Sequence, residues 1–119
     1  PRNVWLGATI CNQAEADRDI PKLLATPAAV RFLSIEPMLG RIDLSFAMPW
    51  RTVENGLLNR SLDWVICGGE SGPHARPMHP HWARDLRDQC AAAGVPFFMK
   101  QMTKRAEIPA DLMTREFPQ

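Results

Sequence analysis

Charged and hydroxyl side chains follow two apolar segments of this chain at the points where those segments end. Residues 62–69 form a largely apolar run that breaks into Gly-Gly-Glu-Ser-Gly, so that Glu70 and Ser71 come directly after it, and Glu36 ends an earlier run. Such a run is typical of a strand buried in a parallel sheet. Ligands of parallel sheets bind outside the carboxyl ends of the strands. Glu36, Glu70 and Ser71 are therefore candidate ligand-binding residues.

Lys100 is the third charged candidate, and side-chain alternation predicts where it points. In a strand that ends at residues 100–101, Lys100 shares a face with Phe98. We therefore expect Lys100 to lie between Glu36 and Glu70 at one end of the sheet. Such a group of charges could hold an amino-acid-like or phosphate-bearing ligand. The alternative is that these residues are charged only because the strands return to water there.

Three histidines lie close together in the sequence, at His74, His79 and His81. Their spacing matches no established metal-binding motif. His79 precedes Pro80, a pair that is typical of the start of a helix. We therefore expect no metal site in this chain and a structural or solvent-exposed position for these rings.

The three cysteines, Cys11, Cys67 and Cys90, are too far apart in the sequence for a disulfide framework or for paired metal ligands. Cys67 lies within an apolar run and Cys90 on the apolar stripe of a helix, so we expect both to be buried packing residues. Cys11 follows a strand and is the only cysteine whose position would suit a reactive thiol.

These candidates require strands and helices that alternate along the chain. The pattern of apolar residues and turn signals predicts strands over residues 4–10, 29–36, 64–69 and 95–99. It predicts helices over residues 14–26 and 80–93, with Pro21 kinking the first helix or beginning another. The expected fold is α/β: a four-stranded, mainly parallel sheet with flanking helices and right-handed crossovers.

The length of the chain, 119 residues, suits a single domain over residues 1–119. Two segments have no clear pattern. We expect residues 41–61 to form an irregular insertion in which residues 42–44 could add an edge strand. We expect residues 106–119 to form a loosely packed tail.

The charge balance argues against two classes of partner. The 14 Lys and Arg residues nearly cancel the 13 Asp and Glu residues, and no block of like charge occurs, so a nucleic-acid partner is not expected. No apolar run is long enough to span a membrane. We therefore expect a cytoplasmic protein without a membrane partner.

Several linked motifs in the same order resemble the C-terminal half of the phage-associated, radical-SAM-like proteins that carry an N-terminal three-cysteine motif. The resemblance covers nearly the whole chain. The segments that carry it are residues 3–7 (NVWLG), 26–32 (TPAAVRF), 34–40 (SIEPMLG), 63–72 (DWVICGGESG), 75–80 (ARPMHP), 94–101 (GVPFFMKQ) and 115–118 (REFP).

The resemblance implies the C-terminal half of a partial TIM-type barrel, with Glu36, Glu70 and Lys100 at its rim. In a full-length relative it implies S-adenosylmethionine and an iron–sulfur cluster on three closely spaced cysteines. This chain has no such triplet, so we expect no cofactor in it, no redox activity by it alone, and either a missing N-terminal half or self-association as its partner. The alternative is a noncatalytic module of phage origin that binds a small ligand or has a structural role.

Overall fold

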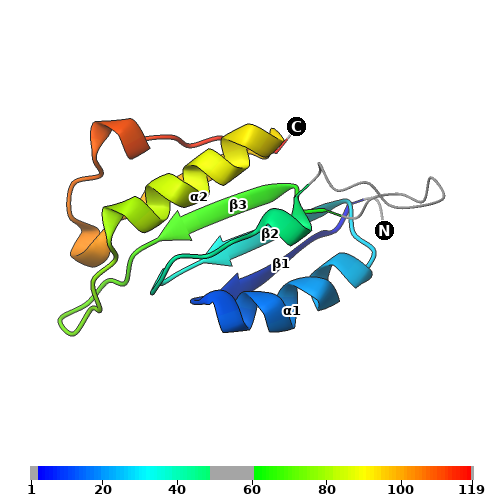
Figure 1. Ribbon diagram of the computed structural model, residues 1–119, viewed down its shortest axis with the longest axis horizontal. Coiled ribbons are helices and arrows are strands. Elements are labelled where there is room, and N and C mark those ends of the chain that lie inside the picture. Colours follow the sequence, from blue (N-terminus) through cyan, green and yellow to red (C-terminus); the bar gives the residue numbers. More distant parts are fainter. Residues whose placement is uncertain (1–2, 49–60, 119) are drawn as a thin grey trace.

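The computed structural model describes residues 3–48 and 61–118, and all structural statements refer to these residues. Strands form a single sheet, shown in Figure 1: β1 (Trp5–Ile10), β2 (Val30–Ile35), β3 (Trp64–Gly68) and β4 (Phe97–Gln101). All neighbouring strands are parallel, and their order is β1-β2-β3-β4. The α/β fold with a four-stranded parallel sheet is thereby confirmed.

Two helices connect strands of the sheet. Helix α1 (Gln13–Ala25) begins at Asn12, whose side chain accepts a hydrogen bond from the N–H of Glu15, and it continues through Pro21 as one helix. Of the two alternatives for Pro21, a kink or the start of another helix, the second is therefore wrong. Helix α2 (Pro80–Ala93) ends at Gly94, which adopts the left-handed conformation (φ 71°) that glycine accepts readily.

Both helices pack on the same face of the sheet, as Figure 1 shows. The buried core contains alternate strand residues together with the inner stripes of both helices. It includes Leu33, Ile35, Val65, Cys67, Phe97 and Met99 from the strands, Ala16, Ile20 and Leu23 from α1, and Ala83, Leu86 and Cys90 from α2. This placement follows from right-handed crossovers between sequential parallel strands.

The opposite face of the sheet has no helix on it in the described part of the chain. We call it the open face, and its strand residues are Trp5, Gly7, Thr9, Phe32, Ser34, Trp64, Ile66, Phe98 and Lys100. Trp5 is 52% exposed there, whereas the core-face residues of the two central strands, Leu33, Ile35, Val65 and Cys67, are fully buried. An aromatic surface of this kind on a sheet is a candidate contact region.

The connection between β2 and β3 fills the space between the two helices. Ile42 and Leu44 are fully buried in the core and are not part of a strand, so the possible edge strand at residues 42–44 is wrong. The short 3₁₀ helix η1 (Ser45–Ala47) follows them. Residues 49–60 of the expected insertion lie outside the described residues.

Two glutamines fasten this connection to the helices. The Gln13 side chain of α1 accepts a hydrogen bond from the N–H of Asp43 (2.6 Å) and donates one to its carbonyl (3.1 Å). The Gln89 side chain of α2 accepts one from the N–H of Leu44 (2.8 Å) and donates one to the carbonyl of Ile42 (2.8 Å). The two glutamines thereby provide hydrogen-bond partners for backbone groups of residues 42–44 that are not paired within a strand or helix.

Part of the C-terminal tail packs against the sheet: Leu112 is fully buried, and residues 114–116 lie along β4. After the 3₁₀ helices η3 (Thr103–Arg105) and η4 (Ala110–Leu112), the chain returns antiparallel along β4. The N–H of Met99 donates to the carbonyl of Thr114 (2.8 Å), and the N–H of Glu116 donates to the carbonyl of Phe97 (2.9 Å). These bonds hold the tail on the outer edge of β4.

In the described ranges, neither helix has both the length and the apolar content that crossing a membrane requires.

The packed tail leads to a stability prediction. Leu112 is fully buried, and Leu112→Ala should therefore lower the free energy of unfolding by about 2–5 kcal/mol through lost burial and a residual cavity. Met113→Ala is the matched control because that neighbour is 54% exposed and should change stability by less than about 0.5 kcal/mol. Urea unfolding of both variants measures the difference, and equal midpoints would contradict the packing of the tail.

Candidate functional site

The carboxyl ends of the strands bring Glu36 and Lys100 into contact. Glu36 follows β2 and Lys100 lies in β4, and the Lys100 Nζ is 3.0 Å from each carboxylate oxygen of Glu36. The Glu36 side chain is 25% exposed and that of Lys100 is 51% exposed. The pair is a bidentate ion pair at the solvent-facing end of the open face.

This ion pair crosses β3, which lies between β2 and β4. Because β2 and β4 are separated by β3, they are about 9–10 Å apart, and only long side chains can meet across β3. Gly68 makes the crossing possible: a Cβ on Gly68 would lie 3.1 Å from the Glu36 Oε2 and 3.2 Å from its Cδ. The first residue of the Gly-Gly pair therefore provides the floor on which the ion pair lies.

Glu70 is engaged by a different cation. Its Oε1 accepts hydrogen bonds from the N–H (2.8 Å) and the Nε (2.9 Å) of Arg76, and its Oε2 accepts one from the Nη2 of Arg76 (2.8 Å). These bonds, with the guanidinium charge, lower the pKa of Glu70 to about 2. Glu70 is thus an ionised carboxylate that closes the loop after β3.

The loop that carries Glu70 is also fixed to the segment after β4. The carbonyl of Glu70 accepts a hydrogen bond from the N–H of Lys104 (2.8 Å). A Cβ on Gly69 would lie 2.4 Å from the backbone nitrogen of Thr103, so the two backbones approach here more closely than any side chain allows. The second glycine of the pair therefore serves a backbone contact.

The structure places the predicted charges at one end of the sheet but in separate pairs. Glu36, Glu70 and Lys100 all lie at the carboxyl ends of the parallel strands β2, β3 and β4. Lys100 contacts Glu36, whereas the Glu70 carboxylate is taken by Arg76. Ser71 is exposed in the same loop, one residue beyond Glu70. Lys100 is therefore not the bridge between two carboxylates that the sequence led us to expect.

The cysteine thiols are poorly suited to nucleophilic chemistry. Burial raises the pKa of Cys67 and of Cys90 to about 12. Burial and the neighbouring Glu15 also raise the pKa of Cys11, whose Sγ lies 3.9 Å from the Glu36 carbonyl oxygen. All three thiols are free and remain protonated at neutral pH.

The histidines begin helix α2. The His79 Nδ1 accepts a hydrogen bond from the N–H of His81 (3.1 Å), and the two rings stack with centroids 4.9 Å apart. His74 is exposed in the preceding loop. Within residues 3–48 and 61–118, no group of three or more His, Cys, Asp and Glu side chains is arranged to hold a metal ion.

Aromatic rings form a cluster on the open face, centred on Trp64. Its ring centroid lies 6.1 Å from that of Trp5, 5.9 Å from that of Phe32, 6.0 Å from that of Phe98 and 5.6 Å from that of Phe117. The Trp64 Nε1 donates to the carbonyl of Glu116 (2.8 Å). The tail thus reaches over the edge of β4 and places Phe117, itself 62% exposed, on the open face.

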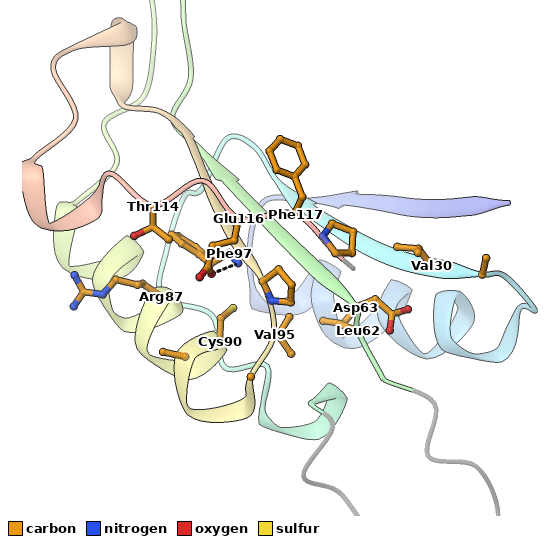
Figure 2. A pocket seen from close by; sticks show the side chains of 15 residues that line it. Val30, Leu62, Asp63, Arg87, Cys90, Val95, Phe97, Thr114, Glu116 and Phe117 are labelled. Carbon is orange, nitrogen blue, oxygen red and sulfur yellow. Dashed lines mark hydrogen bonds between the residues drawn. The ribbon is translucent and has the colours of Figure 1, made fainter. Parts of the chain in front are cut away.

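A cavity of about 1020 Å³ lies at the other end of the sheet, where β2, β3 and β4 begin. Figure 2 shows its walls, which come from these strand starts, the end of α2 and the tail. Its charged side chains are already paired: Glu116 accepts from the N–H of Phe97 (3.0 Å), Asp63 accepts from the N–H of Arg31 (2.9 Å), and Arg87 contacts Asp111. The cavity is therefore separate from the Glu36–Lys100 pair and offers few unpaired polar groups to a ligand.

Sequence reasoning missed Arg76 and the cavity for different reasons. Arg76 is six residues after Glu70 in the same Gly- and Pro-containing loop, so its position in the sequence could have indicated an ion pair with Glu70. The cavity walls come from four separate stretches of the chain, and no local pattern could have identified them.

The fold and site define an α/β protein whose parallel sheet carries paired charges at the carboxyl ends of its strands. The family described as "Protein of unknown function (DUF5131)" matches residues 1–115, and the chain belongs to that family. No curated protein and no solved structure matched the chain significantly.

The Glu70 contacts predict a pH-dependent stability difference. Because the folded pKa of Glu70 falls from its usual 4.5 to about 2, its contribution is present above pH 4.5 and is lost as the pH falls through 2. Glu70→Gln should therefore unfold at a lower temperature than the wild type at pH 7, and the gap should narrow below pH 4.5. Calorimetry across this pH range measures it, with the exposed Glu107→Gln as control. A gap that widens on acidification would refute the assignment.

Proposed function

We propose that this chain is the C-terminal portion of a phage-associated, radical-SAM-like protein and is inactive as a redox enzyme by itself. In this proposal the four strands are the second half of a partial TIM-type barrel. An N-terminal half would bring a cluster on three closely spaced cysteines, and the open face would line the interior of the assembled barrel.

The observation that carries the proposal is the one-sided sheet. Sequential parallel strands with crossovers on one face are the arrangement from which TIM-type barrels are built. The open face supplies aromatic rings near the beginning of the strands and the Glu36–Lys100 pair at their carboxyl ends, where such barrels bind ligands. The match of the DUF5131 family supports a shared fold over residues 1–115 and leaves the reaction open.

The cysteines of this chain do not fit an iron–sulfur cluster. Cys67 and Cys90 are fully buried on the helix-covered side of the sheet, and Cys11 lies near the Glu36 carbonyl. Clusters are held by thiolates brought together at one site, usually from closely spaced cysteines. We therefore assign no cofactor to residues of this chain and derive no chemical step through one.

The alternative function is a noncatalytic module that binds a small ligand at the same end of the sheet. The Glu36–Lys100 pair favours it, because Lys100 is half exposed and could exchange its carboxylate partner for an anionic ligand. This function needs no second half, since both charges belong to this chain.

The source gene distinguishes the two functions. We expect the sequence upstream of the Pro1 codon to encode three closely spaced cysteines, and we expect the 119-residue chain to retain no stoichiometric iron or sulfide after anaerobic reconstitution. An in-frame start codon at this point would instead favour the ligand-binding module. An iron–sulfur cluster retained by the 119-residue chain alone would contradict two parts of the proposal: that the cluster belongs to an N-terminal half, and that the cysteines of this chain do not bind it.

Lys100 tests the ligand-binding function directly. Lys100→Met keeps an unbranched side chain, one atom shorter, and removes the charge. The loss of a half-exposed ion pair should change the unfolding free energy by less than about 1 kcal/mol. If the pair binds anions, the affinity for inorganic phosphate should fall about tenfold. Isothermal titration with the exposed Lys104→Met as control measures this, and equal phosphate binding by all three proteins would reject the module.

A further inference from the structure

Two cations at the carboxyl ends of the strands have side chains without a partner. Lys104 and Arg105 follow β4 in the 3₁₀ helix η3, and both are exposed. Within residues 3–48 and 61–118, every other lysine or arginine side chain is paired with a carboxylate or donates to a backbone carbonyl. Those of Lys104 and Arg105 form no hydrogen bond or ion pair with the described residues, so two positive charges are left for a ligand.

Lys104 and Arg105 also have an unusual backbone. Their φ angles are 54° and 58°, and they are the only residues other than glycine with positive φ in the described part of the chain. This left-handed region brings the Cβ of an L-residue close to the backbone, and glycine or asparagine would adopt it at a lower cost in energy. Strained positions of this kind are concentrated at binding sites, where the surrounding structure holds them.

Hydrogen bonds from the loop after β3 hold this strained segment. The N–H of Lys104 donates to the carbonyl of Glu70 (2.8 Å). The side-chain hydroxyl of the preceding residue, Thr103, accepts from the N–H of Met78 (2.8 Å). Figure 1 shows the loop after β3 and the segment after β4 at the same end of the sheet. The two segments therefore form one connected surface there, which we call the rim.

The unpaired cations lie close to the Glu36–Lys100 pair on this rim. Gly68 is the floor of that pair, and Glu70 follows it by two residues, which span at most about 7 Å. Because the carbonyl of Glu70 accepts from the N–H of Lys104, the two sets of cations occupy neighbouring parts of the rim.

The carboxylates of the rim do not neutralise the two cations. Glu36 is bonded to Lys100, and Glu70 is bonded to Arg76. Glu107 is the acidic residue nearest to Arg105 in the sequence, and it is exposed. An anionic ligand therefore meets uncompensated positive charge beyond the Glu36–Lys100 pair.

We propose that Lys104 and Arg105 form a second anionic subsite beside the Glu36–Lys100 pair, and that the ligand of this rim carries a diphosphate or triphosphate chain. Lys100 takes one phosphate group, and the subsite takes the next. An arginine guanidinium binds phosphate oxygens through two parallel hydrogen bonds, and a lysine adds a compact charge. This ligand class rests on the ligand-binding function proposed above for the Glu36–Lys100 pair, and it narrows that function.

Glycine substitutions separate binding from folding at this subsite. Lys104→Gly removes the cation and keeps a residue that accepts the left-handed backbone, so it should unfold at the same temperature as the wild type or at a higher one. Its affinity for inorganic tripolyphosphate should fall about tenfold, as should that of Arg105→Gly. The double variant should lose about a hundredfold.

Lys22→Met is the matched control for the loss of one positive charge. Lys22 is exposed in the last turn of α1, which returns from the carboxyl end of β1 to the start of β2. Its loss should leave the affinity for tripolyphosphate unchanged. Lys104→Asn is the second variant if Lys104→Gly does not fold, because asparagine also accepts the left-handed region. Isothermal titration measures the affinities, and circular dichroism measures the unfolding temperatures.

Inorganic phosphate separates this subsite from the function proposed for Lys100. A single phosphate group needs only Lys100, so Lys104→Gly should bind it like the wild type, whereas Lys100→Met should bind it more weakly. If Lys100→Met binds inorganic phosphate normally while Lys104→Gly loses affinity for tripolyphosphate, the role of Lys100 is rejected and the subsite stands. The reverse pattern keeps the role of Lys100 and rejects the subsite.

ATP distinguishes the sources of such a phosphate chain. Tighter binding of ATP than of tripolyphosphate would assign the chain to a nucleotide, and equal or weaker binding would assign it to a free polyphosphate. Either result supports the subsite when Lys104→Gly weakens the binding of both compounds.

Three results would overturn the proposal. The first is a wild-type chain that binds tripolyphosphate no more tightly than inorganic phosphate. The second is a folded double variant that binds tripolyphosphate like the wild type. The third is a loss in Lys22→Met as large as that in Lys104→Gly, which would show an effect of net charge alone.

Discussion

Parallel pairing of sequential strands is the constraint on which the rest of this structure depends. Each strand must be followed by a crossover to the far end of the sheet, and the right-handed preference puts all such crossovers on one face when the strand order is β1-β2-β3-β4. The helices α1 and α2 and the connection with η1 therefore share one side. The uneven sheet that results has a closed core on one face and an aromatic surface on the other.

The middle crossover shows how the core is completed without a third long helix among the described residues. Ile42 and Leu44 fill the gap between the helices with apolar volume, while Gln13 and Gln89 bond the backbone of the same segment. Each glutamine side chain donates to one backbone carbonyl of the segment and accepts from one backbone N–H. An irregular segment packed against a core has no strand or helix partner for these backbone groups, so the side chains must supply the hydrogen bonds. The segment therefore behaves as a third covering element.

The glycine pair at the end of β3, Gly68 and Gly69, determines how charges are shared at the carboxyl ends of the strands. Gly68 leaves room for Glu36 and Lys100 to meet across the middle strand, and Gly69 lets the β3 loop contact the backbone that follows β4. With Lys100 drawn toward Glu36, Glu70 is paired with Arg76 of its own loop. Two separate ion pairs result, and only the Glu36–Lys100 pair lies on the open face.

The sequence by itself determined the elements whose signals are local. Apolar runs identified the four strands, Pro80 and Gly94 marked the ends of α2, and the chain order of strand and helix gave the parallel sheet, because these features depend on residues close together in the chain. Tertiary structure decided the rest. The partner of Lys100, the burial of Leu112 and the closure of the β4 edge each join segments far apart in the sequence, and side-chain reach and packing volume, rather than local pattern, select such contacts.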